Sequence, residues 1–298
     1  MGNYTSRPIW LKRITGSKPL SAIVIITAVI IADMLLHSFL PFDFLEIDTR
    51  DFLQKYFDKE ALSLSQWCIL FWNWNIRLLV KDLFQIVIII CLLFRFRFTK
   101  AENFQISRHT AVIAALSFLT SALALLYLFR YDVLNDGRMW QARIVDVFRT
   151  IFVVSLLEEL VYRGFISNVL FRLKPNGLKT SVAIAISGAV FGFVHIQGGI
   201  TRVFMGFPPS FSWGTAETFF STAVFGVSSA LILYHRKDLI ALICIHAAHN
   251  ILLESYRSSG ESMLMGALYV SFYCILLICY PVILCFKARK QSEALRSG

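Results

Sequence analysis

The sequence predicts an all-α polytopic membrane protein with about eight transmembrane helices. Three observations lead to this class. The chain has 298 residues, 57% of them apolar or aromatic, and only 16% are charged. Its mean hydropathy is +0.64. A soluble domain carries roughly 25% charged residues, and a spanning helix needs about 20 apolar residues. The composition therefore excludes a soluble globule and suffices for about eight spans.

Apolar runs alternate with polar or basic segments along the chain. The first run, 20–40, is too long for the apolar part of a signal peptide and lacks a small-residue cleavage site, so we predict a retained span. A polar loop follows at 41–65, and the aromatic-rich residues 66–74 are expected at the membrane interface. The eight predicted spans are 20–40, 83–98, 111–129, 144–171, 180–196, 216–234, 239–253 and 264–286.

Lysine and arginine residues are unevenly divided by these spans. Seventeen lie on the side that receives both termini and ten on the other, while Arg149 and Arg163 lie within the fourth span. The positive-inside rule then predicts cytoplasmic termini, in the plasma membrane if the chain is prokaryotic. The basic residues behind the net charge of +10 cluster between the spans, which indicates membrane topology. We therefore expect membrane lipid as a partner and no nucleic acid.

Polar residues inside the fourth span form the first of three unusual clusters. An ionisable residue in hydrocarbon costs roughly 2.5–3.5 kcal/mol on the insertion scale, which makes it a candidate for function. Glu159 and Arg163 stand at i and i+4 and are expected to pair. Glu158, near the middle of the span, points about 100° away at a different neighbour. Glu158 is therefore a candidate general base; the alternative, a structural ion-pair cluster, leaves Glu158 unexplained.

The second cluster ends the fifth span with the pattern Phe191-Gly-Phe-Val-His195. Gly188 and Gly192 are four residues apart, a spacing that lets a neighbouring helix approach closely. For His195 taken alone, an interfacial histidine bonded to a carbonyl is the simpler interpretation.

The third cluster lies in the seventh span. His246 and Asn250 share a helical face at i and i+4, and His249 lies between them. Three polar side chains within five residues are costly in lipid, so they are expected to face the interior of the helix bundle. An interhelical hydrogen-bond network is the alternative to a functional role.

Together the three clusters contain the groups needed to activate water. A carboxylate can act as base, an imidazole can orient or protonate, and amide or imidazole donors can stabilise an oxyanion. Because His and Glu also ligate zinc, a divalent metal held by Glu158, His195 and His246 stays open. The motifs H-E-x-x-H and G-x-S-x-G are absent, so a thermolysin-like zinc site and a serine nucleophile are not supported.

Residues 197–215 are rich in glycine, proline and aromatic residues. This segment is expected to be too broken for a helix and too apolar for an ordinary loop. We predict either a substrate entrance beside His195 or a connector at the membrane interface.

The ordered clusters resemble the CPBP family of intramembrane proteases, named for CAAX processing and bacteriocin processing (the Abi domain). The family pattern is E-E-x-x-x-R, then F-x-x-x-H, then H-x-x-x-N, and this chain matches it without substitution between about 144 and 253. The matching residues are Glu158, Glu159, Arg163, Phe191, His195, His246 and Asn250.

The resemblance implies eight helices around a polar intramembrane cavity. It implies that Glu158 activates water with help from His195, and that His246 and Asn250 stabilise the oxyanion. Glu159 and Arg163 would hold the site together, and His249 lies outside the pattern. Type II CAAX prenyl endopeptidases belong to the family, but the motifs do not fix a prenylated substrate, and either a glutamate-dependent or a metallo-endopeptidase fits them.

We therefore predict an intramembrane endopeptidase that hydrolyses a peptide bond of a membrane-associated or lipidated peptide. Residues 1–143 would hold the first three helices, 144–254 the catalytic core, and 255–298 the last helix and a basic tail. The main alternative is a non-catalytic immunity or signalling-regulator protein of the same fold. A transporter or channel is a third hypothesis, weakened by the lack of an inverted repeat.

Overall fold

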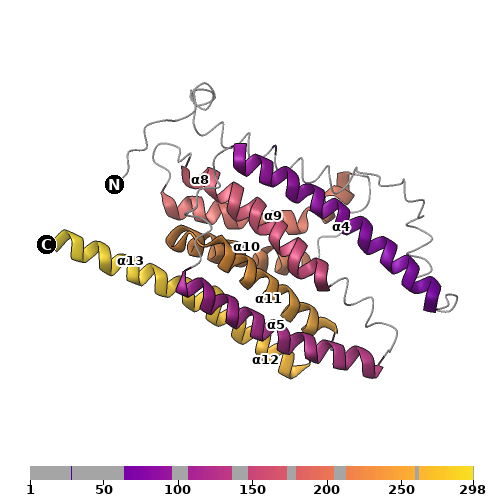
Figure 1. Cartoon of the computed structure of the whole chain (residues 1–298). Helices are drawn as coiled ribbons and strands as arrows, with labels where there is room; N and C mark the ends of the chain where they lie inside the picture. The colour runs from indigo at the N-terminus through magenta and orange to yellow at the C-terminus, as the bar shows by residue number, and fades with distance from the viewer. Residues whose placement is uncertain are drawn as a thin grey trace. The chain divides into compact units, whose positions relative to one another are not determined.

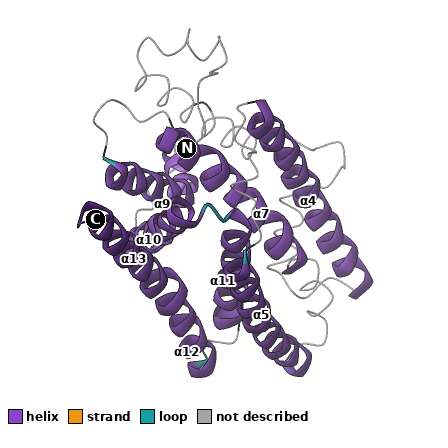
Figure 2. Ribbon diagram, turned by 60° about the vertical axis from the view of Figure 1, so that its left-hand side comes forward, coloured by secondary structure: helices purple, strands orange, loops and turns teal. Residues whose placement is uncertain are grey.

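A computed structural model describes residue 28 and residues 64–95, 107–135, 147–172, 179–204, 213–258 and 262–297. These residues are almost entirely helical, and no strand occurs among them (Figure 2). They fall into two compact units. One includes Phe165–Ala230, and the other is made from Pro41–Gly164 and Leu231–Gly298. The predicted span 20–40, apart from residue 28, and most of the predicted loop 41–65 lie outside the described residues.

The second unit is built around helix α11 (Leu239–Ser258), which packs against α5 (Arg108–Asn135), η4, α7 and α12. Figure 1 shows α5 running alongside α11. Ala124 and Leu128 of α5 are fully buried, and Ser255 of α11 donates a hydrogen bond to the Ala124 carbonyl at 3.3 Å. The other elements are α4 (Leu64–Arg95), η4 (Arg149–Val154), α7 (Ser155–Glu158), η5 (Glu159–Ser167, to residue 164), α12 (Met263–Phe272), η6 (Tyr273–Cys279) and α13 (Tyr280–Ser297).

The start of α11 is fixed by a buried carboxylate. Lys237 has φ 54, a left-handed conformation that separates α11 from the preceding helix. Asp238 Oδ1 accepts the backbone N–H of Ala241 at 2.9 Å, as an N-cap residue does. Its Oδ2 accepts the hydroxyl hydrogen of Thr110 at the start of α5. This cap sets the position of α11 along α5, and with it the position of the polar residues two turns later.

Helix α4 carries a buried charge cluster. Asp82 is 2% exposed and accepts a hydrogen bond from Arg149 Nε of η4 at 2.8 Å, while Lys81 Nζ lies 3.6 Å from its other oxygen. Arg149, predicted inside the fourth span, therefore has a carboxylate partner on another helix. The cluster ties α4 to the first turn of the helix that carries the two glutamates.

The first unit contains α8 (Asn168–Arg172), α9 (Thr180–Phe204) and most of α10 (Trp213–Arg236). The predicted close approach at Gly188 and Gly192 is confirmed: a Cβ at Gly192 would lie 2.7 Å from the Phe219 carbonyl, and one at Gly188 would lie 2.8 Å from the Ala223 carbonyl. Only hydrogen fits at these positions, so α9 and α10 pack backbone to backbone.

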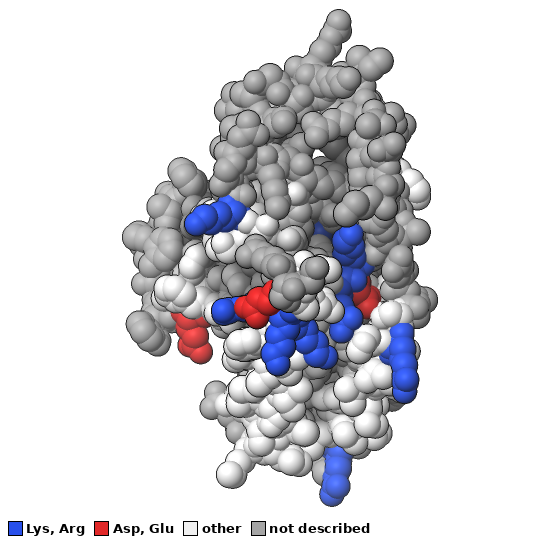
Figure 3. All heavy atoms as spheres, turned by 90° about the vertical axis from the view of Figure 1, so that its left-hand side faces the viewer, with Lys and Arg blue, Asp and Glu red and all other residues white. Residues whose placement is uncertain are grey.

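Four of the described helices are long and apolar enough to cross a membrane. The first part of α9, Thr180–Ile196, is a shorter apolar helical stretch. Phe118 and Leu126 of α5 are 77% and 69% exposed, as expected of side chains facing lipid, and most described atoms on the face in Figure 3 belong to uncharged residues. The protein is thus a helical membrane protein. The candidate membrane-spanning segments of these helices are Arg108–Arg130, Gly214–Arg236, Leu239–Arg257 and Met263–Leu295.

Helix α4 runs from Leu64 to Arg95, so residues 66–74 and the predicted span from residue 83 to residue 95 lie in one helix. Two sequence predictions differ from the structure. The fourth span is not a uniform α-helix, because the π-helical segments η4 and η5 interrupt it. The expectation that 197–215 is not helical was wrong for its first part, because α9 continues to Phe204.

Candidate active site

Glu158 and Glu159 lie at the junction of two kinds of helix. Glu158 ends the short segment α7, and Glu159 begins the π-helical segment η5. Such π turns are rare and are frequently found at functional sites. Facing this junction, α11 packs against α7 and η4 and presents His246 and Asn250.

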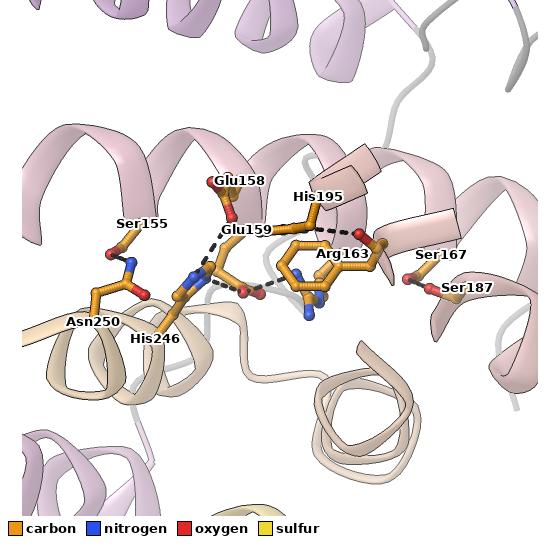
Figure 4. Close-up of polar contacts among 10 residues, drawn as sticks. Ser155, Glu158, Glu159, Arg163, Ser167, Ser187, His195, His246 and Asn250 are labelled. Atoms are coloured by element: carbon orange, nitrogen blue, oxygen red, sulfur yellow. Dashed lines mark hydrogen bonds and ion pairs between the residues drawn. The ribbon is translucent and has the colours of Figure 1, made fainter. Parts of the chain in front are cut away.

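Glu159 is the centre of a buried ion-pair network (Figure 4). Its Oε1 lies 3.0 Å from Arg163 Nη1 and accepts a hydrogen bond from His246 Nδ1 at 2.8 Å. Glu159 and Arg163 are 0% exposed and His246 is 3% exposed. The predicted i, i+4 pair is confirmed, and it is extended by an imidazole from a second helix. A carboxylate buried this deeply is tolerated only because both partners surround it.

Glu158 has a different environment from its neighbour. Its side chain is 23% exposed, and its Oε2 lies 3.5 Å from His246 Nε2. The prediction that the two glutamates face different neighbours was wrong. The nitrogens of one imidazole lie on different edges of the ring, so His246 contacts both carboxylates at once (Figure 4).

Asn250, one turn after His246, bonds to a serine that the sequence analysis missed. Its Nδ2 donates a hydrogen bond to Ser155 Oγ at 3.3 Å (Figure 4). Ser155 Oγ in turn donates to the Thr150 carbonyl at 2.9 Å. Ser155 is 0% exposed, whereas Asn250 is half-buried. The available sequence signal was a hydroxyl residue inside an apolar run, three residues before Glu158.

His195 belongs to the other compact unit, on α9. Its Nδ1 donates a hydrogen bond to the Phe191 carbonyl at 2.8 Å, since a carbonyl can only accept. The His195 ring also lies against the Phe191 ring, with centroids 4.4 Å apart. His195 is exposed. In the neutral ring this bond assigns the proton to Nδ1 and leaves Nε2 as the nitrogen with a lone pair. The predicted carbonyl bond of His195 is thus present.

His249 contacts aromatic side chains that follow α11 in the chain. Its ring centroid lies 5.4 Å from that of Tyr269 in α12 and 6.0 Å from that of Tyr273 in η6. These contacts help to hold α11 against α12 and η6.

A cavity of about 180 Å³ adjoins Asn250. It runs along α11, where Asn250 and Glu254 share a face, and it extends to α5 and η4. Its lining is apolar near Leu128 and Ile251 and charged at Arg257. The lining residues are Leu128, Val147, Thr150, Asn250, Ile251, Leu253, Glu254 and Arg257.

The candidate metal ligands do not form a metal centre in the described part of the chain. No group of three or more His, Cys, Asp or Glu side chains there has an arrangement that could hold a metal ion. Of the proposed set, Glu158 and His246 lie together, but both nitrogens of His246 face carboxylates. The contacts present suit proton transfer between these groups.

One family of known proteins matches the part of the chain that carries the candidate site. Residues 139–252 match the family model described as type II CAAX prenyl endopeptidase, Rce1-like. This stretch contains every residue of the three clusters. No curated protein and no solved structure matches the chain. The resemblance to the CPBP and CAAX protease family is confirmed over residues 139–252, the part of this membrane protein that matches the Rce1-like family model.

Proposed function

We propose that this protein is an intramembrane endopeptidase that hydrolyses a peptide bond of a membrane-associated or lipidated peptide with water activated by Glu158. The single observation that carries this proposal is the contrast within the pair. The side chain of Glu158 is 23% exposed, while those of Glu159, Arg163 and His246 beside it are at most 4% exposed. The Glu158 side chain is thus partly accessible to water and substrate, while its Oε2 is buried beside His246.

Glu158 acts as the general base. It removes a proton from water as the water oxygen attacks the carbonyl carbon of the scissile bond. His246 keeps one proton on Nδ1, where Glu159 accepts it at 2.8 Å, so its Nε2 faces Glu158 at 3.5 Å. The proton taken from water is then shared between Glu158 and His246 Nε2. The family resemblance implies an oxyanion role for His246, but contacts of both ring nitrogens with carboxylates favour this proton-sharing role.

Asn250 stabilises the tetrahedral intermediate. Its carboxamide donates an N–H to the oxygen that becomes negatively charged when water adds to the carbonyl. The Glu158–His246 pair then returns the proton to the leaving nitrogen, the C–N bond breaks, and a carboxylic acid and an amine are released. The cavity beside Asn250 offers space for residues next to the scissile bond.

His195 has a supporting role in this proposal. Its bond to the Phe191 carbonyl fixes the ring so that Nε2 can accept or return a proton. The family resemblance supports a role for His195 as an assistant of Glu158 in water activation. His195→Ala is expected to lower kcat by about 10²–10⁴, the range of a general acid or base, with a smaller change in KM.

Substrate trapping tests the proposal. Purified Glu158→Gln protein keeps the size and polarity of the side chain but loses the base, so it is expected to bind substrate without cleaving it. Mass spectrometry of the co-purifying peptides would identify the substrate, and the wild type should cleave the same peptides. Unchanged cleavage by a folded Glu158→Gln protein would disprove the base role.

Metal analysis of the purified protein separates the two endopeptidase types. A stoichiometric divalent ion that is lost in the Glu158→Gln and His246→Gln proteins, together with activity, would favour the metallo-endopeptidase. The glutamate-dependent mechanism predicts full activity in protein that contains no such ion.

A further inference from the structure

We propose that Ser155 is a positioning residue that aims the Asn250 carboxamide at the developing oxyanion. This inference rests on the proposed proteolytic function and adds a residue outside the three family motifs. Ser155 touches none of the reacting atoms in the mechanism above. It acts through Asn250, across the contact between α7 and α11.

The hydrogen-bond directions around Ser155 can be assigned. The serine hydroxyl has one hydrogen, and it is donated to the Thr150 carbonyl at 2.9 Å, because a carbonyl can only accept. Toward Asn250 the serine oxygen must therefore accept. The group that faces it at 3.3 Å is then the amide nitrogen of Asn250, and the amide oxygen is turned away. Ser155 thus selects one of the two orientations of the carboxamide.

The π-helical turn before Ser155 holds the serine in place. The Thr150 carbonyl accepts both the backbone N–H and the hydroxyl of Ser155, five residues later in the chain. Ser155 is 0% exposed, so water cannot replace either partner. Its side chain is therefore fixed before any substrate binds, which is the condition for preorganised electrostatic stabilisation.

The Asn250 amide nitrogen has two hydrogens, and Ser155 accepts only one of them. The second hydrogen is directed by the first because the amide group is planar. Asn250 is half-buried and lines the cavity of about 180 Å³, so the second N–H is the donor a substrate can reach. Without Ser155 the carboxamide can rotate and present its oxygen, which would repel an oxyanion.

A double-mutant cycle tests this role with Ser155→Ala, Asn250→Ala and the double variant. If Ser155 acts through Asn250, Ser155→Ala lowers kcat by about 10- to 100-fold with little change in KM, and it has no further effect once Asn250 is alanine. Affinity for a phosphonate peptide, which imitates the tetrahedral intermediate, should fall with kcat. An additive double variant, or a loss of kcat/KM through KM alone, would overturn the proposal.

Ser167→Ala is the matched control. Ser167 is also 0% exposed, lies on the same helical run, and shares a hydrogen bond of 2.7 Å with Ser187. Its replacement removes a buried serine hydrogen bond without touching Asn250. It should change thermal stability about as much as Ser155→Ala while leaving phosphonate affinity unchanged. An equal loss of affinity in both variants would assign Ser155 a general structural role and overturn the proposal.

An NMR measurement that needs no peptide cleavage tests the role of Ser155 independently of the proposed protease function. The side-chain amide signal of Asn250 in ¹⁵N-asparagine-labelled protein, assigned with Asn250→Ala, should shift and exchange faster in Ser155→Ala but not in Ser167→Ala. An unchanged signal would overturn the contact itself. Full activity of Glu158→Gln would instead disprove the proposed base, while an altered Asn250 signal would still support the contact.

Discussion

Glu158 and Glu159 are neighbours in the chain, yet the side chain of Glu158 is 23% exposed and that of Glu159 is 0% exposed. This difference predicts different consequences for the same substitution. Glu158→Gln should lower kcat by at least about 10²–10⁴, the contribution of a general base, with little loss of stability. Glu159→Gln should destabilise the fold by about 3–5 kcal/mol because it breaks a buried ion pair. Peptide cleavage and thermal unfolding in detergent measure the two effects.

The pair of variants also separates the main alternative. In a non-catalytic immunity or regulator protein, Glu158→Gln would leave the cellular phenotype intact, whereas Glu159→Gln would still reduce the amount of folded protein. Equal effects of the two substitutions on stability would contradict the division of roles between the two carboxylates.

Two arginine–glutamate pairs with the same i, i+4 spacing, one buried and one exposed, allow the effect of burial on the stability of an ion pair to be tested. Arg163 and Glu159 lie 3.0 Å apart at i, i+4 with side chains at most 1% exposed, and Arg289 and Glu293 lie 2.8 Å apart with side chains more than half exposed. Arg163→Met should cost about 3–5 kcal/mol, since a buried carboxylate loses its partner. Arg289→Met should cost less than about 1 kcal/mol, the usual value of an exposed pair.

Thermal unfolding of both methionine variants under the same detergent conditions provides the comparison. His246 also contacts Glu159, so Arg163→Met should in addition lower kcat by altering the ring that faces Glu158. If both variants unfold at the wild-type temperature, the buried network contributes little to stability.

The sequence was sufficient to predict the helical membrane class, the family resemblance and the Glu159–Arg163 pair. Apolar runs report spanning helices directly, and Glu159 with Arg163 follows from the i, i+4 rule because both residues lie on one helix. The close approach at Gly188 and Gly192 was readable for the same reason. Each of these features depends on residues near one another in the chain.

Features that depend on two helices could not be predicted in this way. The contact of His246 with both glutamates needs the packing of α11 on α7, and an ideal α-helix pointed Glu158 elsewhere. The π turns that bring Ser155 within hydrogen-bond distance of Asn250 cannot be predicted from the pattern of apolar residues. The Asp82–Arg149 pair could not be predicted either, because it joins two helices and residues that are 67 positions apart in the chain.

Glycine substitutions test the packing of α9 on α10. A Cβ at Gly188 would lie 2.8 Å from both the Ala223 carbonyl oxygen and the Val227 backbone nitrogen, so Gly188→Ala must push two helices apart. We expect a loss of about 1–3 kcal/mol, the cost of overpacking. Thermal unfolding and the yield of folded protein measure the effect.

Gly164→Ala is the matched control for this substitution. Gly164 is also helical, but a Cβ there would meet its nearest atom, Leu239 Cδ2, at 3.5 Å, an ordinary van der Waals distance. Alanine at that position should be neutral or stabilising by about 0.5–1 kcal/mol, because it restricts the unfolded chain. Equal tolerance of alanine at both positions would contradict the close approach of α9 and α10.

The cavity beside Asn250 predicts a substitution that affects binding more than chemistry. Leu253 lines this cavity of about 180 Å³ and is half-buried, so Leu253→Trp should fill part of the space without disturbing the glutamates. If residues next to the scissile bond bind there, KM should rise about tenfold, equivalent to about 1.4 kcal/mol, with kcat changed less than about twofold. Leu264→Trp is the control, since Leu264 is 59% exposed and does not line the cavity. Equal KM values for the two variants, measured with the same peptide, would place the substrate outside this cavity.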